Sequence, residues 1–240
     1  GCVDKSAAGL MVGTSGAMRL AWAGEPPDAV PDSLWCYRAD HRRVVVGGAL
    51  SDGGGLYGWL SGALKLGADA DDAALAAMEP DAHGLTLLPF WAGERSTGWS
   101  ARARGAILGL TMNTSPAEIV RAAMEAVAYR FALIAKSLLP FAPEAEIRAS
   151  GGALSASPTW TQILSDALGR PLQLAPAREA SSRGAVLLAL ESLGVIEDIA
   201  ALPTLAPGQT FTPDQARHAL YQEGLARQQR AYEAIIREPL

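Results

Sequence analysis

Cysteine and histidine are scarce in this sequence, and neither sign of charge dominates it. Two cysteines and three histidines in 240 residues are too few for a disulfide scaffold and form no CxxC or HExxH metal-binding spacing. The 20 Lys and Arg residues, against 25 Asp and Glu, form no basic stripe that could neutralise a nucleic-acid backbone. We therefore expect no metal site and no nucleic-acid partner, and the two cysteines fit a reducing cytoplasm.

Long apolar runs are also missing. No run approaches the roughly 20 residues of a membrane span, and residues 1–6 resemble no signal peptide. Since 49% of the residues are hydrophobic, the chain can still bury a substantial core. These features predict a soluble globular protein that does not contact the membrane. Because the first residue is Gly1 and not methionine, we expect the chain to be a piece of a longer protein.

The apolar patterns predict an α/β layer structure. A hairpin is expected at 10–20, with further strands at 43–46, 85–90, 146–149 and 172–174. Helices are expected at 53–67 with Asp52 as N-cap, at 68–79, from the capping box at Ser115 to Leu138, at 157–169, at 181–193 and at 212–236. Trp59 and Trp160 are expected in the core.

Three glycine-marked turns follow strand-like runs, at 13–16, 90–98 and 150–153. Glycine permits positive φ and lets backbone N–H groups approach an anion or a planar ring. The hydroxyl groups of Thr14 and Ser15 add donors for phosphate oxygens. Taken singly, such turns are more often structural than functional, and the chain has neither a P-loop nor a GxGxxG motif.

The order of the surrounding segments is more informative than any single turn. The segments are Val12–Arg19, Val46–Ala49, Leu88–Ser96, Ala103–Leu110, Ser150–Ala153, Trp160–Asp166 and Glu179–Ala185. In this order they resemble the C-terminal domain of the FGGY family of carbohydrate kinases, over about residues 1–193. The local sequence is most similar to gluconate kinases, with xylulose kinases next.

This resemblance implies a ribonuclease H-like, actin-like α/β domain with a mixed sheet flanked by helices. It also implies ATP and Mg²⁺ as cofactors, since phosphoryl transfer depends mainly on positioning and neutralising phosphates. The matching residues are Gly13 and Thr14 in the second phosphate loop, Gly93 in the lining of the nucleotide cleft, and Gly151, Gly152 and Ala153 in the adenosine motif.

The resemblance also implies that part of the enzyme is absent. The family's catalytic aspartate belongs just upstream of the position that Gly1 matches, so no catalytic residue is expected in this chain. We expect residues 1–200 to form the nucleotide-binding lobe and 201–240 to form a linker and a helix packed on it. An N-terminal sugar-binding lobe would precede them, and the isolated chain would be catalytically silent.

Several residues keep more than one interpretation. Glu94 and Arg95 are a solvated pair or an ordering contact in the cleft, and the roles of Arg19 and Ser155 stay open. The family often has proline at Thr97 and an acidic residue at Arg102, which leaves the contacts of this loop open. His41 and His83 have no evident partner, which argues against a catalytic dyad.

We expect the parent protein to use ATP to phosphorylate a small carbohydrate, a sugar or sugar acid. A non-enzymatic, actin-like nucleotide-binding or interaction module is the alternative, and a scaffold that binds nothing is the third interpretation. The specific sugar and the oligomeric state, including a homodimer formed through the last helix, stay open.

Overall fold

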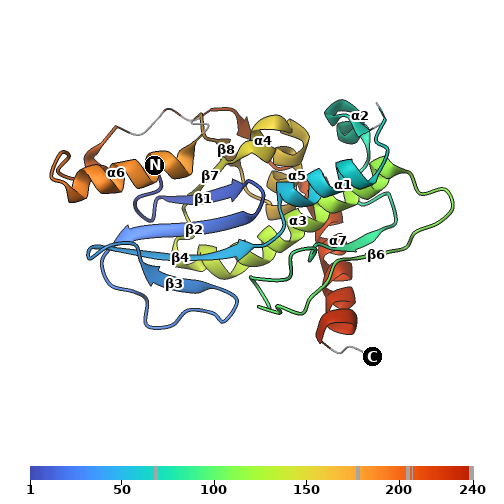
Figure 1. Cartoon of the computed structure of the whole chain (residues 1–240), viewed down its shortest axis with the longest axis horizontal. Coiled ribbons are helices and arrows are strands. Elements are labelled where there is room, and N and C mark those ends of the chain that lie inside the picture. Colours follow the sequence, from blue (N-terminus) through green and yellow to red (C-terminus); the bar gives the residue numbers. More distant parts are fainter. Residues whose placement is uncertain (68–69, 177–178, 204–205, 207, 238–240) are drawn as a thin grey trace.

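A seven-stranded mixed sheet forms the centre of the chain (Figure 1). The computed structural model describes residues 1–67, 70–176, 179–203, 206 and 208–237. The strand order is β3-β4-β2-β1-β7-β8-β9, with β1 antiparallel to β2 and parallel to β7. The strands are β1 (Ala7–Val12), β2 (Gly16–Ala23), β3 (Trp35–Arg38), β4 (Arg43–Leu50), β7 (Glu146–Ser150), β8 (Leu172–Leu174) and β9 (Thr210–Phe211), while β5 (Thr86–Leu88) and β6 (Ala106–Leu108) pair separately.

Helices lie on both faces of the sheet. They are α1 (Gly54–Ala63), α2 (Asp72–Ala77), α3 (Pro116–Leu138), α4 (Gly152–Ala156), α5 (Pro158–Leu168), α6 (Ala180–Ser192) and α7 (Gln215–Tyr232), with shorter helical turns η2 (Leu139–Phe141), η3 (Ile199–Ala201) and η4 (Glu233–Arg237). On β4, Gly48 faces Ile134 of α3. Because strand side chains alternate between faces, Arg43 points to the opposite face, where it pairs with Glu191 of α6.

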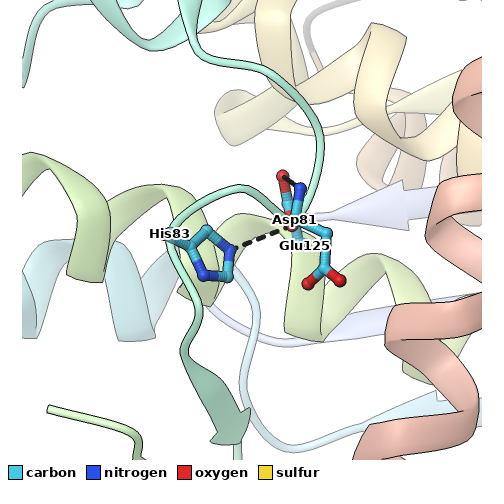
Figure 2. Close-up of side chains that lie close together, drawn as sticks. All are labelled: Asp81, His83 and Glu125. Carbon is cyan, nitrogen blue, oxygen red and sulfur yellow. Dashed lines mark hydrogen bonds and ion pairs between the residues drawn. The ribbon is translucent and has the colours of Figure 1, made fainter.

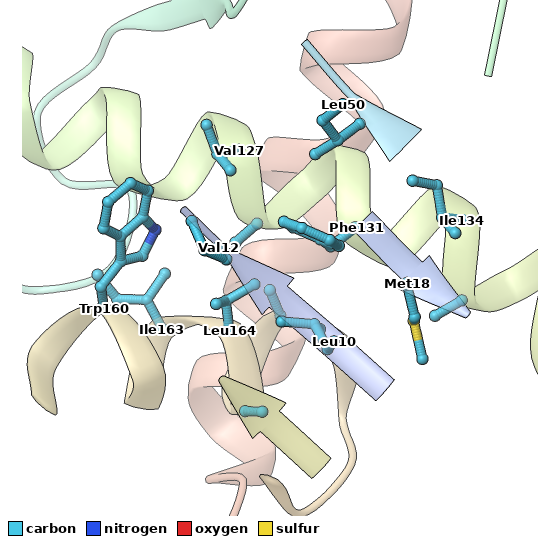
Figure 3. Packing of buried hydrophobic residues seen from close by; sticks show 14 of the residues in the cluster. Leu10, Val12, Met18, Leu50, Val127, Phe131, Ile134, Trp160, Ile163 and Leu164 are labelled. Carbon is cyan, nitrogen blue, oxygen red and sulfur yellow. The ribbon is translucent and has the colours of Figure 1, made fainter. Parts of the chain in front are cut away.

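The core lies between α3, α5 and the first strands of the sheet. Ser115 and Glu118 form the expected capping box at the start of α3. The apolar stripe of this helix, spaced by three and four residues, then packs on the strands. Figure 3 shows the contributing side chains, which include Leu10, Val12, Met18, Leu50, Val127, Phe131, Ile134, Trp160, Ile163 and Leu164.

Some elements differ from the sequence prediction. The strand expected at 43–46 continues through the next two glycines to Leu50. Glycine is required at position 47 because a side chain there would collide with the backbone of β2. The expected helix at 68–79 covers only Asp72–Ala77, and positions 68–69 lie outside the described residues. Trp160 is buried as expected, but Trp59 is 53% exposed and contacts the ring of Trp91.

The last segment joins the same fold. The short strand β9, which the sequence did not indicate, pairs with β8 at the edge of the sheet. Asp214 caps α7 through the N–H groups of Ala216 and Arg217, and α7 packs against α5 and α3. Among the described residues, no helix is both long enough and apolar enough to cross a membrane.

Candidate functional site

The turn between β1 and β2 exposes backbone N–H groups. The Gly13 N–H donates to the Ser15 carbonyl over 2.9 Å and closes the turn. The carbonyl groups of Gly13 and Thr14 are used internally, because they accept N–H groups from the glycine run 53–55 at 2.7 to 3.1 Å. Among the described residues, none accepts the N–H of Thr14 or Ser15. The turn, in which Thr14 is exposed and Ser15 is partly buried, therefore offers these two donors to an anion.

The turn after β7 lies beside the first turn. β1 and β7 are parallel neighbours, so their carboxyl ends lie at the same edge of the sheet, where α/β folds commonly bind ligands. Gly151 has φ +106°, and a Cβ there would lie 2.6 Å from the Val12 carbonyl carbon. Gly152 is exposed, and a Cβ on it would meet nothing within 4 Å. The turn is thus packed tightly on β1 at Gly151 and open at Gly152.

A third glycine loop joins the two turns. The Gly54 N–H donates to the Gly13 carbonyl over 2.7 Å. A Cβ on Gly54 would lie 2.8 Å from that carbonyl oxygen and 3.1 Å from the Ala153 Cβ. The backbone of Gly54 therefore lies directly between the turn 13–15 and the turn 150–153 and contacts both. Sequence reasoning did not single out this glycine, although the run of three glycines after β4 was a visible signal.

Gly93 lies in a loop that Asp52 links to the glycine run 53–55. Gly93 has φ +79° and lies in the loop 90–98. It lines a small cavity together with Asp52 and Arg130. The Ala92 N–H donates to Asp52 Oδ2 over 3.0 Å, and the same loop is bound to β4 by the backbone pair Ser96–Ala49 at 2.9 Å.

Asp52 does not cap α1, so that prediction was wrong. The N-cap is Gly53, and no side chain caps the helix. The Asp52 carboxylate instead accepts the N–H of Ala92 in the loop 90–98, forty residues away in the sequence. Burial raises the pKa of Asp52, and hydrogen bonds from the backbone of Ala92 and Trp91 offset part of that rise.

Glu94 forms a buried contact that orders its loop. Its carboxylate lies 2.5 Å from Arg130 of α3, and both side chains are almost fully buried. It also accepts the N–H groups of Gly98 and Ser100 and the hydroxyl group of Tyr232. Of the two interpretations open for Glu94, the structure supports an ordering contact.

The remaining open residues lie apart from these contacts. Arg95 is exposed, although it borders the cavity beside Gly93. Arg19 pairs in register with Gly9 on β1, and its guanidinium lies 5.9 Å from the Trp35 ring. The Ser155 side chain is exposed, while its N–H donates to the Gly151 carbonyl over 3.1 Å and closes the first turn of α4.

His83 has a partner that the sequence did not reveal. Figure 2 shows it beside Glu125, with Nε2 3.1 Å from Oε2. Asp81 lies close enough to complete a three-residue metal-ligand set. However, Arg227 pairs with Asp81 and Arg121 pairs with Glu125. Because these guanidinium groups already neutralise both carboxylates, the cluster is a structural ion-pair network.

Comparison with known proteins agrees with this geometry. Residues 9–193 match the FGGY family of carbohydrate kinases, C-terminal domain. The chain is 29% identical over 223 residues to the gluconokinase of Bacillus subtilis, covering 87% of this chain and 43% of that protein. It is 36% identical over 192 residues to the glycerol kinase of Variovorax paradoxus, covering 77% and 38%.

Solved structures give the same result. The ligand-bound xylulose kinase from Lactobacillus acidophilus superposes with a TM-score of 0.84 at 26% identity, over 99% of this chain and 49% of that one. The gluconate kinase from the same organism gives 0.80 at 26% identity, over 98% and 48%. The predicted actin-like fold is thereby confirmed. The chain spans less than half the length of these relatives, and it belongs to the FGGY family of carbohydrate kinases, as a C-terminal domain.

Proposed function

We propose that this chain is the ATP-binding lobe of a kinase that transfers the γ-phosphate of ATP to a hydroxyl group of a sugar or sugar acid, of the gluconate or xylulose type. The observation that carries the proposal is the meeting of the turns 13–15 and 150–153 at one edge of the sheet, around Gly54. A bound nucleotide could contact both turns at once, with its phosphates at one and its adenosine at the other.

The residues at each turn suit these roles. The N–H groups of Thr14 and Ser15 have no acceptor among the described residues and would hold terminal phosphate oxygens. Gly151, Gly152 and Ala153 carry small or no side chains, so the adenosine could lie against their backbone. Mg²⁺, when bound through the phosphate oxygens, would neutralise charge during transfer. Gly93 would line the nucleotide cleft from the adjoining loop 90–98.

The sugar and the catalytic base would come from a second lobe. Matched relatives are more than twice as long as this chain, and we propose that an N-terminal lobe carries the sugar site and the catalytic aspartate. The two lobes would close over the substrates and exclude water. We therefore expect the isolated chain to bind nucleotide without phosphorylating sugar, since loss of a general base alone costs about two to four orders of magnitude.

Gly152→Val tests the nucleotide site. Because Gly152 is exposed and a Cβ there meets nothing within 4 Å, we expect the variant to fold with nearly unchanged stability. Its branched side chain would stand where the adenosine should lie, so the ADP affinity should fall at least about tenfold, the equivalent of one lost close contact. Isothermal titration calorimetry with ADP and Mg²⁺ measures this.

Gly184→Val is the matched control. Gly184 is also exposed on a helix with nothing near its Cβ position, but it lies on α6 and not at the turns. We expect it to bind ADP as the unmodified chain does. Equal affinities for both variants would contradict the proposed site, and an unmodified chain that binds no ADP would favour a scaffold that binds nothing.

A further inference from the structure

A single short loop connects all three glycine turns. The loop starts at Asp52 and continues through Gly53, Gly54 and Gly55 into α1. On one side its three glycine N–H groups donate to the carbonyl groups of Gly13 and Thr14. Any movement of this loop would therefore move the turn 13–15 with it.

On its other side, the loop is held by the Asp52 side chain. Asp52 Oδ2 accepts the Ala92 N–H over 3.0 Å, which ties the loop to the segment that carries Gly93. Asp52 is buried, with 7% of the residue exposed. The connection from Ala92 through Asp52 to the turn 13–15 consists of hydrogen bonds and a few residues of backbone, so it is short.

Within the part of the chain that the structure describes, no ion pair compensates the charge of Asp52. Glu94, Arg95 and Arg130 border the same cavity, but the Arg130 guanidinium bonds Glu94 and Thr97. Among the described residues, none forms a salt bridge with Asp52. A buried carboxylate with only backbone donors costs stability. An uncharged residue here would suit the fold alone at least as well.

We propose that Asp52 is a positioning residue, which fixes the glycine loop 53–55 against the loop 90–98 and so holds the turn 13–15 in its nucleotide-binding arrangement. The proposal rests on the proposed function, because it explains how the nucleotide site is kept in shape. Asp52 would not touch the nucleotide itself. It would act through the backbone of the glycine loop.

Asp52→Asn separates positioning from stability. The variant keeps the size of the side chain, but it offers the backbone N–H groups of Ala92 and Trp91 a single neutral oxygen in place of a charged carboxylate, so the hold on the loop 90–98 is weakened. We expect the ADP affinity to fall about tenfold, the equivalent of one hydrogen bond to a charged group. The free energy of unfolding should be unchanged or higher, since a buried charge is removed. A drop in affinity that appears only with a matching drop in stability would overturn the proposal.

The pH dependence provides a second readout. Protonated Asp52 resembles asparagine, so the ratio of the ADP affinities of unmodified chain and Asp52→Asn should shrink toward one as the pH falls through the pKa of Asp52, which burial raises. The titration of ADP itself cancels in this ratio. A ratio that stays constant with pH would show that the charge of Asp52 is irrelevant to binding.

Hydrogen exchange distinguishes failure of this proposal from failure of the proposed function. Without any nucleotide, Asp52→Asn should speed exchange at residues 53–55 and 90–93. Asp214→Asn, which alters a carboxylate that caps α7 through two backbone N–H groups, should leave both segments unchanged. Unchanged exchange in Asp52→Asn would overturn the positioning role. Absence of ADP binding by the unmodified chain would overturn the proposed function, while faster exchange in Asp52→Asn would still show that Asp52 holds the two loops together.

Discussion

Replacing Gly151 by alanine is expected to destabilise the fold by about 3 kcal/mol or more, since a strained backbone and a steric collision are combined. Gly151 adopts φ +106° and ψ 152°, a region that is essentially reserved for glycine. The new Cβ would also lie 2.6 Å from the Val12 carbonyl carbon, in the neighbouring strand. Neither problem can be relieved locally, because Val12 is buried and its strand is paired on both sides.

Gly152→Ala is the matched control for this prediction. The two glycines are adjacent, but Gly152 starts α4 and has open space at its Cβ position. There alanine should change the free energy of unfolding by less than about 1 kcal/mol, in either direction, because helix propensity favours it slightly. Urea unfolding followed by circular dichroism measures both variants. Equal effects would mean that the turn is not pressed against β1.

Local signals predicted the elements that local interactions determine. Ser115 and Glu118 contact each other within one helical turn, so their capping box was recognisable from four residues. Ser157 and Pro158 likewise begin α5 as expected, with Ser157 accepting the Trp160 N–H. The hairpin around Gly13 followed from two apolar runs and a glycine turn. In each case both partners of the interaction lie within a few residues.

Long-range partners could not be predicted in this way. Asp52 looked like a helix cap, but its hydrogen-bond partner is in the loop 90–98. Trp59 looked like a core residue because its helical neighbours are apolar, yet its face of α1 turns outward. The strand β3 is a four-residue edge strand without alternation of buried and exposed positions, so its sequence gave no strand signal.

The candidate site shows the same division. Glycines at 13–16 and 150–153 were recognisable as turns, and their resemblance to one family assigned them a shared role. The two turns meet at Gly54 only because β1 pairs in parallel with β7. This pairing joins residues more than a hundred positions apart, so the sequence could not reveal it. Glu94 stayed ambiguous for a related reason, because its partner Arg130 lies on the buried face of α3.

Glu94→Ala is the second change with a large expected effect. Removing one partner of a buried ion pair leaves the other charge uncompensated, which typically costs about 3–5 kcal/mol. Here Arg130 is 2% exposed and cannot reach solvent, and its guanidinium lies over the rings of Phe90 and Tyr232. Burial already lowers the pKa of Arg130, and the charge of Glu94 works against that effect. Chemical unfolding should therefore show a large loss of stability.

Glu25→Ala is the control, because Glu25 pairs with Arg38 at 2.6 Å, but the two side chains are 86% and 41% exposed. Solvent screens this pair, so its loss should cost less than about 1 kcal/mol. Comparable losses in Glu25→Ala and Glu94→Ala would indicate that burial of the inner pair is not what makes it important.

A second substitution identifies the cause of the loss. Adding Arg130→Met to Glu94→Ala removes the uncompensated cation and puts an apolar chain of similar length between Phe90 and Tyr232. If the uncompensated charge of Arg130 causes most of the loss of stability, the double variant should be about 1–2 kcal/mol more stable than Glu94→Ala. If the double variant is less stable than Glu94→Ala, the main contribution of Glu94 is instead the acceptance of the N–H groups of Gly98 and Ser100. The loop beside the nucleotide site would then depend on hydrogen bonds more than on charge.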